Sequence, residues 1–158
     1  MSAGQLSVEV QFAYLTILVS LPVLWASDAI YLALITSAVT PTKTDADPRW
    51  GTGGSTNYST NEVTPGGNYS AGGILLTGTT VTKSSNVMSL NATSPVTWNG
   101  NAVNPTNARW GILYSSTDAG KHAIGIGDLG GVISLVNGLQ LKLNASLSGT
   151  QPVLQLTV

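Results

Sequence analysis

Residues 108–128, ARWGILYSSTDAGKHAIGIGD, decide the fold of this chain because they read as two β-strands joined by a polar turn. The alternation of Trp110, Ile112 and Tyr114 gives the first strand one continuous face. Serine, threonine, aspartate and glycine follow as turn residues, and 122–128 is a second apolar run. The stretch therefore predicts a β-hairpin at the centre of a sheet.

The rest of the composition agrees with a β-protein whose surface carries little charge. The chain has 158 residues, no cysteine, six Lys or Arg and seven Asp or Glu, so 8% of residues are charged against roughly 25% in ordinary globular proteins. Threonine-rich strands and Asn/Gly turns are typical of all-β folds. A net charge of −1 with six basic residues speaks against nucleic-acid binding and favours association with other proteins.

Short apolar runs separated by turn residues predict about nine strands, and hence an all-β fold: an antiparallel β-sandwich or barrel-like domain. Asn137-Gly138 predicts a two-residue hairpin turn, because a type I′ turn needs positive φ at both positions. The expected strands are 29–37, 74–82, 87–91, 95–98, 108–115, 122–128, 132–136, 139–146 and 153–158.

Two parts of the chain stand apart from this pattern. Residues 1–28 form an apolar N-terminal segment, and 29–158 form a single β-rich domain with a long surface loop at 38–73. The loop is rich in proline and glycine, but its aromatic residues argue against simple disorder. Those aromatics could stack on sugar rings or bury themselves in a partner subunit, and the second reading is favoured. They are Trp50, Tyr58 and Tyr69.

The apolar run FAYLTILVSLPVLW at 12–25 is short for a bilayer span and lacks the basic flank of a signal peptide. Such a segment has to be covered by protein. We expect it to pack between subunits of a homo-oligomer or onto a capsid neighbour; the alternative is one or two strands inside the same domain, within 6–24. The side chains expected at that contact are Phe12, Tyr14, Leu18, Leu21 and Trp25.

Chemistry is sparse. His122 is the only histidine, so a two-histidine relay is excluded. It could act as a general base, oriented by Asp118 or Asp128, with Ser115, Ser116 or Thr117 as nucleophile. No oxyanion loop accompanies these residues, so a structural histidine at a hairpin tip is the favoured reading and an enzyme is not expected.

Metal and cofactor sites are not expected either. Asp45 and Asp47 could bind calcium, but TDADPRWG lacks the remaining ligands of a calcium loop. The glycines of IGIGDLGG suggest bulges and turns, because neither a lysine nor a helix follows as in a phosphate-binding loop.

An ordered set of motifs runs through the domain: YLALITS (31–37), NEVTPGGNYSAGGILL (61–76), VTW (96–98), ARWGILY (108–114) and IGIGDLGG (124–131). This set resembles small structural proteins of tailed bacteriophages, which serve as head decoration (cement), neck or tail proteins. The resemblance covers roughly 29–158, and the longer, more apolar N-terminal segment departs from it.

The resemblance implies a virion protein assembled in the host cytoplasm. Its first expected role is capsid decoration, with copies of itself, a trimer foremost, and the major capsid protein as partners. Neither nucleic acid nor a membrane is an expected partner, and no cofactor is expected. The alternatives are a neck, tail or fibre component of the virion, or a secreted sugar-binding β-sandwich that uses the loop aromatics.

Overall fold

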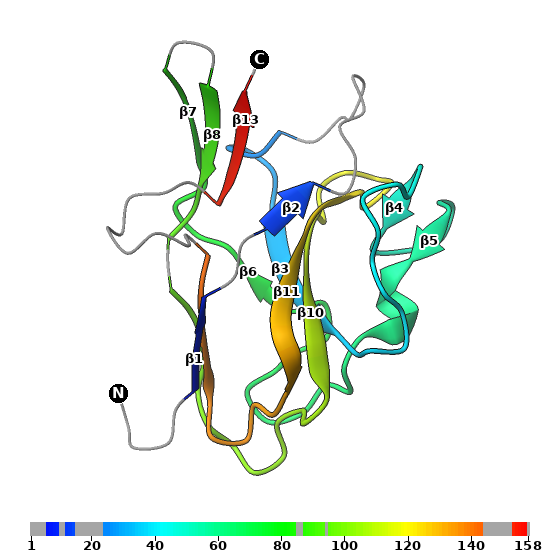
Figure 1. The fold of residues 1–158 in the computed structure, drawn as a ribbon, viewed down its shortest axis with the longest axis vertical. Coiled ribbons are helices and arrows are strands. Elements are labelled where there is room, and N and C mark those ends of the chain that lie inside the picture. The colour runs from blue at the N-terminus through cyan, green and yellow to red at the C-terminus, as the bar shows by residue number, and fades with distance from the viewer. Residues whose placement is uncertain are drawn as a thin grey trace.

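The computed structural model describes residues 6–9, 12–14, 24–84, 87–93, 95–143 and 153–157. Thirteen strands and one short 3-10 helix make up its elements, with strands accounting for 42% of the structure (Figure 1). The strands are β1 Leu6–Glu9, β2 Phe12–Tyr14, β3 Ile30–Ile35, β4 Pro48–Arg49, β5 Thr56–Asn57, β6 Ile74–Leu75, β7 Thr80–Ser84, β8 Val87–Asn91, β9 Val96–Trp98, β10 Ala108–Ser115, β11 Ala123–Ile133, β12 Leu139–Lys142 and β13 Leu154–Thr157; the 3-10 helix η1 is Tyr58–Asn61.

The predicted hairpin is confirmed as β10 and β11, which pair antiparallel at the centre of a five-stranded sheet. The strand order is β2-β11-β10-β3-β6, so β10 is hydrogen-bonded on both sides. β3, the strand expected at 29–37, pairs antiparallel with β10 over its whole length. Both central strands are rich in β-branched, leucine and tyrosine side chains, which pack well on a pleated surface.

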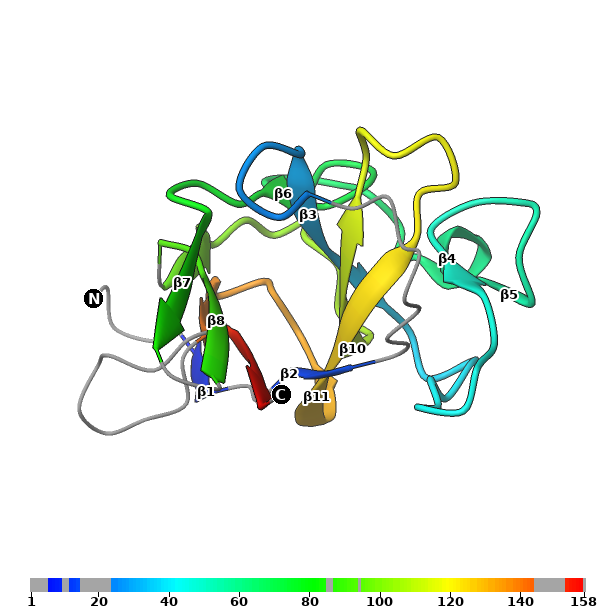
Figure 2. The same ribbon diagram turned by 90° about the horizontal axis from the view of Figure 1, so that it is seen from above.

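Two three-stranded sheets lie beside this central sheet (Figure 2). One has the order β1-β12-β9, with β1 parallel to β12 and β9 antiparallel to it. The other is the antiparallel sheet β13-β8-β7, which extends away from the central sheet in Figure 1. The short strands β4 and β5 form a separate parallel pair on the opposite side.

Both faces of the central sheet are covered by apolar side chains. Alternate residues of β3 point to opposite faces, so Leu32 and Leu34 join one core cluster and Ala33 and Ile35 join another. The larger cluster also contains the buried side chains of β9 and β12, which are Val96, Trp98, Leu139 and Leu141. The smaller cluster is closed by Trp50 and Tyr58 from the segment expected to be a surface loop.

That segment, 38–73, folds back over the sheet instead of leaving it. Trp50, Tyr58 and Tyr69 are 5%, 1% and 2% exposed, respectively. The segment pairs with β3 near its residues 61–63, through an Ile35–Glu62 bridge and a hydrogen bond from Val63 N–H to the Leu34 carbonyl. Sequence reasoning recognised that the aromatics oppose disorder, but it placed them at the surface because no strand pattern surrounds them.

Two predictions at the end of the hairpin are wrong. The expected strand 132–136 does not form, because β11 continues as far as Ile133 and a turn follows. Asn137-Gly138 does not close a two-residue hairpin: Gly138 has a φ of 87°, but it is the fourth residue of a turn in which its N–H donates to the Leu135 carbonyl. The next strand, β12, pairs with β9 and β1 rather than with β11.

At the N-terminal end, 6–9 and 12–14 form strands that pair within the domain, which agrees with the alternative reading for this part of 6–24. β1 pairs with β12, and β2 pairs antiparallel with β11. Both are edge strands of their sheets. The remainder of 6–24, apart from residue 24 itself, lies outside the described residues.

The all-β prediction is thus confirmed at the level of mostly antiparallel sheets with almost no helix, and a closed barrel is not seen. Within the described part of the chain, no helix is long and apolar enough to cross a membrane.

Candidate functional site: two polar junctions of the hairpin

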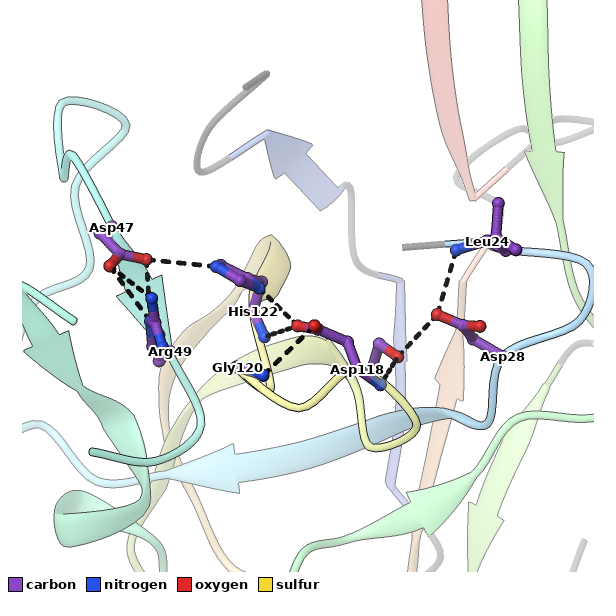
Figure 3. A network of polar contacts seen from close by, with 8 residues as sticks. Leu24, Asp28, Asp47, Arg49, Asp118, Gly120 and His122 are labelled. Carbon is purple, nitrogen blue, oxygen red and sulfur yellow. Dashed lines mark hydrogen bonds and ion pairs between the residues drawn. The ribbon is translucent and has the colours of Figure 1, made fainter. Parts of the chain in front are cut away.

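The only histidine lies at the tip of the β10–β11 hairpin, where the segment carrying β4 comes alongside. Arg49 forms an isolated β-bridge with His122, and Trp50 N–H donates to the Lys121 carbonyl over 2.8 Å. Four charged or titratable side chains meet here, and Figure 3 shows them in a row. We call this cluster the tip junction; its members are Asp47, Arg49, Asp118 and His122.

In the tip junction the imidazole of His122 lies between two carboxylates. Its Nδ1 is hydrogen-bonded to Asp118 Oδ2, and its Nε2 is 3.5 Å from Asp47 Oδ1. Asp47 is also paired with Arg49, whose Nε and Nη2 donate to the carboxylate at 2.9–3.1 Å. The His122 side chain is 14% exposed, so solvent reaches little of the ring.

Asp118 organises the turn. Its carboxylate accepts hydrogen bonds from the backbone N–H groups of Gly120 and His122, at 3.2 and 3.0 Å, as well as from the ring. Burial alone would raise the pKa of Asp118, but these hydrogen bonds from His122 and Gly120 outweigh it and hold the pKa below its ordinary value. The carboxylate is therefore the form that the folded turn stabilises.

The three hydroxyls considered as nucleophiles are engaged elsewhere. Ser115 Oγ donates to Asp28 Oδ2 at 2.9 Å, and Ser116 Oγ donates to the Ala29 carbonyl at 3.3 Å. Thr117 Oγ1 accepts from the Ala29 N–H at 2.8 Å. All three fasten the hairpin tip to the turn that precedes β3.

The sequence offered Asp118 or Asp128 as the partner of His122, and the structure brings Asp118 to the ring but none of the three candidate nucleophiles. In a relay of this kind the second imidazole nitrogen must face the hydroxyl that it deprotonates. Here Nε2 faces the Asp47 carboxylate instead. Asp128, the other candidate partner, pairs with Arg109. Together with the contacts of residues 115–117, the arrangement links the hairpin tip to the segment carrying β4 and to the turn that precedes β3.

The aspartates considered for calcium do not converge on one point. Asp47 faces Arg49, whereas Asp45 accepts hydrogen bonds from the hydroxyls of Ser55 and Tyr58. Burial would raise the pKa of Asp45, but the hydrogen bonds from Ser55, Thr56 and others lower it below its ordinary value. Among the described residues, no group of three or more His, Cys, Asp or Glu side chains could hold a metal ion.

At the other end of the hairpin lies a second polar cluster, which sequence reasoning missed. Asn104 is 3% exposed, and its side chain makes three hydrogen bonds. Nδ2 donates to the carbonyls of Asn99 and Leu135 at 2.8 and 2.9 Å, and Oδ1 accepts from the Asn68 N–H at 2.7 Å. The Asn68 side chain also donates to the Asn99 carbonyl, at 3.1 Å. We call Asn68, Asn99, Asn104 and Leu135 the amide junction.

The side chains predicted to contact a partner are distributed differently from expectation. Trp25, Trp50, Tyr58 and Tyr69 are all buried within the chain. Trp25 Nε1 donates to the Asn91 carbonyl at 2.8 Å, and the Trp50 ring stacks on Tyr114 with centroids 4.9 Å apart. The prediction assumed rings at the surface, and the structure gives them partners inside the chain instead.

The other predicted contact residues lie at or beyond the limits of the description. Phe12 and Tyr14 belong to β2, whose backbone alone is described. Leu18 and Leu21 lie outside the described residues. Contact of these four side chains with a partner stays a prediction.

Comparisons with protein families, with curated proteins and with solved structures gave no match for this chain.

Proposed function

We propose that this chain is a structural protein of a tailed-bacteriophage virion, and that its role is to decorate the capsid. The proposal is supported mainly by the contacts that residues 61–76, the longest motif of the resemblance, make with the central sheet. The residues of this motif that match the phage proteins include Glu62, Tyr69 and Gly73, and these residues hold the segment against the sheet, so the resemblance rests on residues that build the fold.

Glu62 and Tyr69 show this most directly. The Tyr69 hydroxyl accepts a hydrogen bond from the Leu34 N–H at 2.9 Å and donates to Glu62 Oε1 at 3.0 Å. The same carboxylate oxygen accepts from the Gly72 N–H at 2.6 Å. A buried tyrosine and a half-buried glutamate thereby hold the segment against β3.

Gly73 is the second fastening point. It has a φ of 82°, and a Cβ built on it would lie 2.1 Å from the Leu32 carbonyl oxygen. Only glycine fits such a close approach of two backbones. β6 begins at the next residue and pairs with β3, so the motif supplies an edge strand of the central sheet.

The small number of charged side chains supports a function that depends on association with other protein molecules. Six basic and seven acidic side chains in 158 residues leave few charges to keep molecules apart, and the net charge is −1. Contacts made by such a surface are insensitive to salt, because screening acts on charge–charge terms. The proposed partners are further copies of this chain, as a trimer, and the major capsid protein.

We also propose that the sheets stack as an antiparallel β-sandwich.

The proposed role needs no chemistry from the tip junction, which acts as a fastening between segments. A sugar-binding role has lost the observation that favoured it, because the loop aromatics are buried. A neck, tail or fibre position belongs to the same proposal of a virion component and differs from decoration in copy number.

Quantitative mass spectrometry of purified particles tests the proposal. Capsid decoration requires a number of copies comparable to that of the major capsid protein. A number matching a single ring or spike would place the chain in the neck, tail or fibre and overturn the decoration role. Absence of the chain from purified particles would overturn the whole proposal.

Binding to preformed capsids provides an independent test. Purified full-length protein is mixed with capsids that lack it, and bound protein is separated by sedimentation. Saturable binding that persists at high salt is the expected result. Binding that disappears in moderate salt would contradict a contact made by uncharged surface.

A further inference from the structure

The chain contains two Asn-Gly pairs, Asn99-Gly100 and Asn137-Gly138, and the structure treats them in opposite ways. Asparagine followed by glycine is the dipeptide most prone to succinimide formation, because glycine has no side chain to hinder attack by its own backbone nitrogen. The reaction needs that nitrogen to be free of other hydrogen bonds and reachable by water. These two conditions can be compared at the two sites.

At Asn137-Gly138 the glycine nitrogen is held. Gly138 is buried, and its N–H donates to the Leu135 carbonyl over 2.8 Å within a turn. Attack on the Asn137 side chain would first require this hydrogen bond to break. It would also require a buried nitrogen to lose its proton.

At Asn99-Gly100 both residues are exposed, and no acceptor for the Gly100 N–H is found in the described part of the chain. The local pairing explains this. Asn101 N–H donates to the Val136 carbonyl, continuing the antiparallel register of β9 and β12. Hydrogen-bonded and non-bonded positions alternate in such a ladder, so the N–H of the preceding residue points away from the partner strand.

We propose that Asn99 is a site of spontaneous deamidation in the folded protein. The Gly100 nitrogen loses its proton to solvent base and forms a bond to Cγ of Asn99. The bond from Cγ to the side-chain nitrogen breaks, and ammonia leaves. Water then opens the resulting succinimide at either carbonyl and yields aspartate or isoaspartate, with no change of oxidation state.

The position of Asn99 gives this modification a structural consequence. The Asn99 carbonyl accepts hydrogen bonds from the side chains of Asn104 and Asn68. In the isoaspartate product the main chain runs through the former side chain, gains one methylene, and leaves a free carboxylate in place of that carbonyl. The amide junction thereby loses a neutral acceptor, and the chain gains one negative charge on a net charge of −1.

The test follows both asparagines in one sample. Folded full-length protein is incubated in mildly alkaline buffer below its melting temperature, and peptide mapping measures aspartate plus isoaspartate at each position. Asn99 should convert faster than Asn137 by about fivefold or more, the factor expected for breaking one backbone hydrogen bond before attack. Equal rates, or faster conversion of Asn137, would overturn the proposal.

Unfolding and a substitution complete the design. In concentrated urea the hydrogen bond at Gly138 is absent, so the two rates should converge; a ratio that persists unchanged would mean that local sequence, not the fold, sets it. The Asn99→Gln variant keeps the amide but needs a larger ring to form. The first acidic species seen by isoelectric focusing should therefore disappear in this variant, and its persistence would contradict the assignment to Asn99.

Discussion

The tip junction and the amide junction fasten opposite ends of the β10–β11 hairpin, and they do so with opposite chemistry. The tip junction joins its segments through two carboxylates, a guanidinium and an imidazole. The amide junction joins three segments through side-chain and backbone amides alone. The comparison teaches that a charge-poor protein can fasten one hairpin in two ways: with ionisable side chains that range from the buried carboxylate of Asp118 to the partly exposed Asp47 and Arg49, and with a buried neutral amide, Asn104.

Burial differs within the tip junction. Asn104 is 3% exposed, and an uncharged amide can be buried at that depth once its hydrogen bonds are made. The Asp118 side chain is also buried, at 4% exposed, and it is satisfied by hydrogen bonds from the turn, whereas Asp47 and Arg49 keep 31% and 22% of their side-chain surface in water. Ion pairs in this partly exposed setting contribute little to stability, so the two junctions should respond differently to mutation, pH and salt.

The largest expected effect comes from removing the Asn104 side chain, which lies at the centre of the amide junction. Asn104→Ala would leave the Leu135 carbonyl and the Asn68 N–H without their partner, while the Asn99 carbonyl would keep the Asn68 side chain as its donor; each unsatisfied buried group costs about 1–3 kcal/mol, and the packing of the Asn104 side chain is lost as well. We expect a loss of about 3 kcal/mol or more in the free energy of unfolding, measured by urea denaturation. The matched control is Asn107→Ala, an exposed asparagine of the same loop, which should change stability by less than about 0.5 kcal/mol. Similar losses in the two variants would show that Asn104 is not a hub.

The tip junction should be weaker. Asp118→Ala removes the acceptor for the backbone N–H groups of Gly120 and His122 and for the imidazole. The Asp118 side chain is 4% exposed, but Gly120 and His122 are partly exposed, so water can replace part of the lost hydrogen bonding. The expected loss is about 1–2 kcal/mol by the same denaturation measurement. Asp118→Asn keeps one neutral oxygen as acceptor and should lose less than Asp118→Ala. A larger loss in Asp118→Asn would mean that the amide group is excluded by the ring of His122.

Acid should weaken the tip junction and leave the amide junction unchanged, because only the tip junction contains carboxylates. The pKa of Asp118 is lowered in the folded state, so the folded protein binds fewer protons there than the unfolded chain. Its contribution to stability is present above the ordinary value of 3.8 and is lost as the pH falls through the folded-state pKa. The difference between wild type and Asp118→Asn should therefore shrink in that acid range, while the cost of Asn104→Ala stays constant. A constant cost for both variants would contradict the lowered pKa.

Glu62 is a carboxylate whose pKa is shifted in the opposite direction. Burial raises its pKa, and the hydrogen bonds from Gly72 and Tyr69 offset that rise only in part. The folded state then holds the proton more tightly than the unfolded chain, so this contribution is present below the ordinary value of 4.5 and is lost as the pH rises through the raised pKa. Relative to wild type, Glu62→Gln should become more stable as the pH rises through this interval. The measurement is urea denaturation of both proteins across the interval, and an opposite trend would overturn the sign.

The smallest effect belongs to the exposed ion pair on β10 and β11. Arg109 pairs with Asp128, whose side chain is 52% exposed, and its guanidinium lies 4.1 Å from the centroid of the Trp110 ring. Arg109→Lys should cost less than about 1 kcal/mol in low salt and less still in high salt, because exposed pairs are screened. A cost that does not change with salt would point to the contact with the ring as the source.

Sequence reasoning succeeded where one face of a strand is apolar and the other is not. Leu139, Leu141 and Leu143 alternate with polar residues in the strand expected at 139–146, as in a half-buried strand, and all three leucines are buried. The hairpin at 108–128 was predicted for a similar reason. Trp110 shares one face of the strand with Ile112 and Tyr114, which are buried, but is itself only partly buried; the pairing of β10 with β11 is irregular between Ala108 and Trp110.

The failures come from contacts that no local pattern encodes. Asn137-Gly138 carries the signal of a hairpin, yet the partner of the following strand lies far away in the sequence, so the local turn does not set the pairing. Asn104 is one of eleven asparagines, and nothing in its neighbours marks it as the one that is buried among those whose burial the structure describes. For the site, the sequence offered Asp118 or Asp128 as partners of His122 without choosing between them, and the contact with Asp47 depends on how the long segment folds back.

The pairing of the first strands with the last ones has a consequence for the order of events during synthesis. β1 and β2 leave the ribosome early, but their partners, β12 and β11, are made only when residues 123–142 emerge. Until then residues 12–14, the start of the apolar run, lack the strand with which they pair, and unpaired apolar strands of this kind are prone to associate with other chains. Pairing between segments so far apart also makes folding slow. A growing chain is therefore most open to association with its neighbours before the two ends of its own sheets have met.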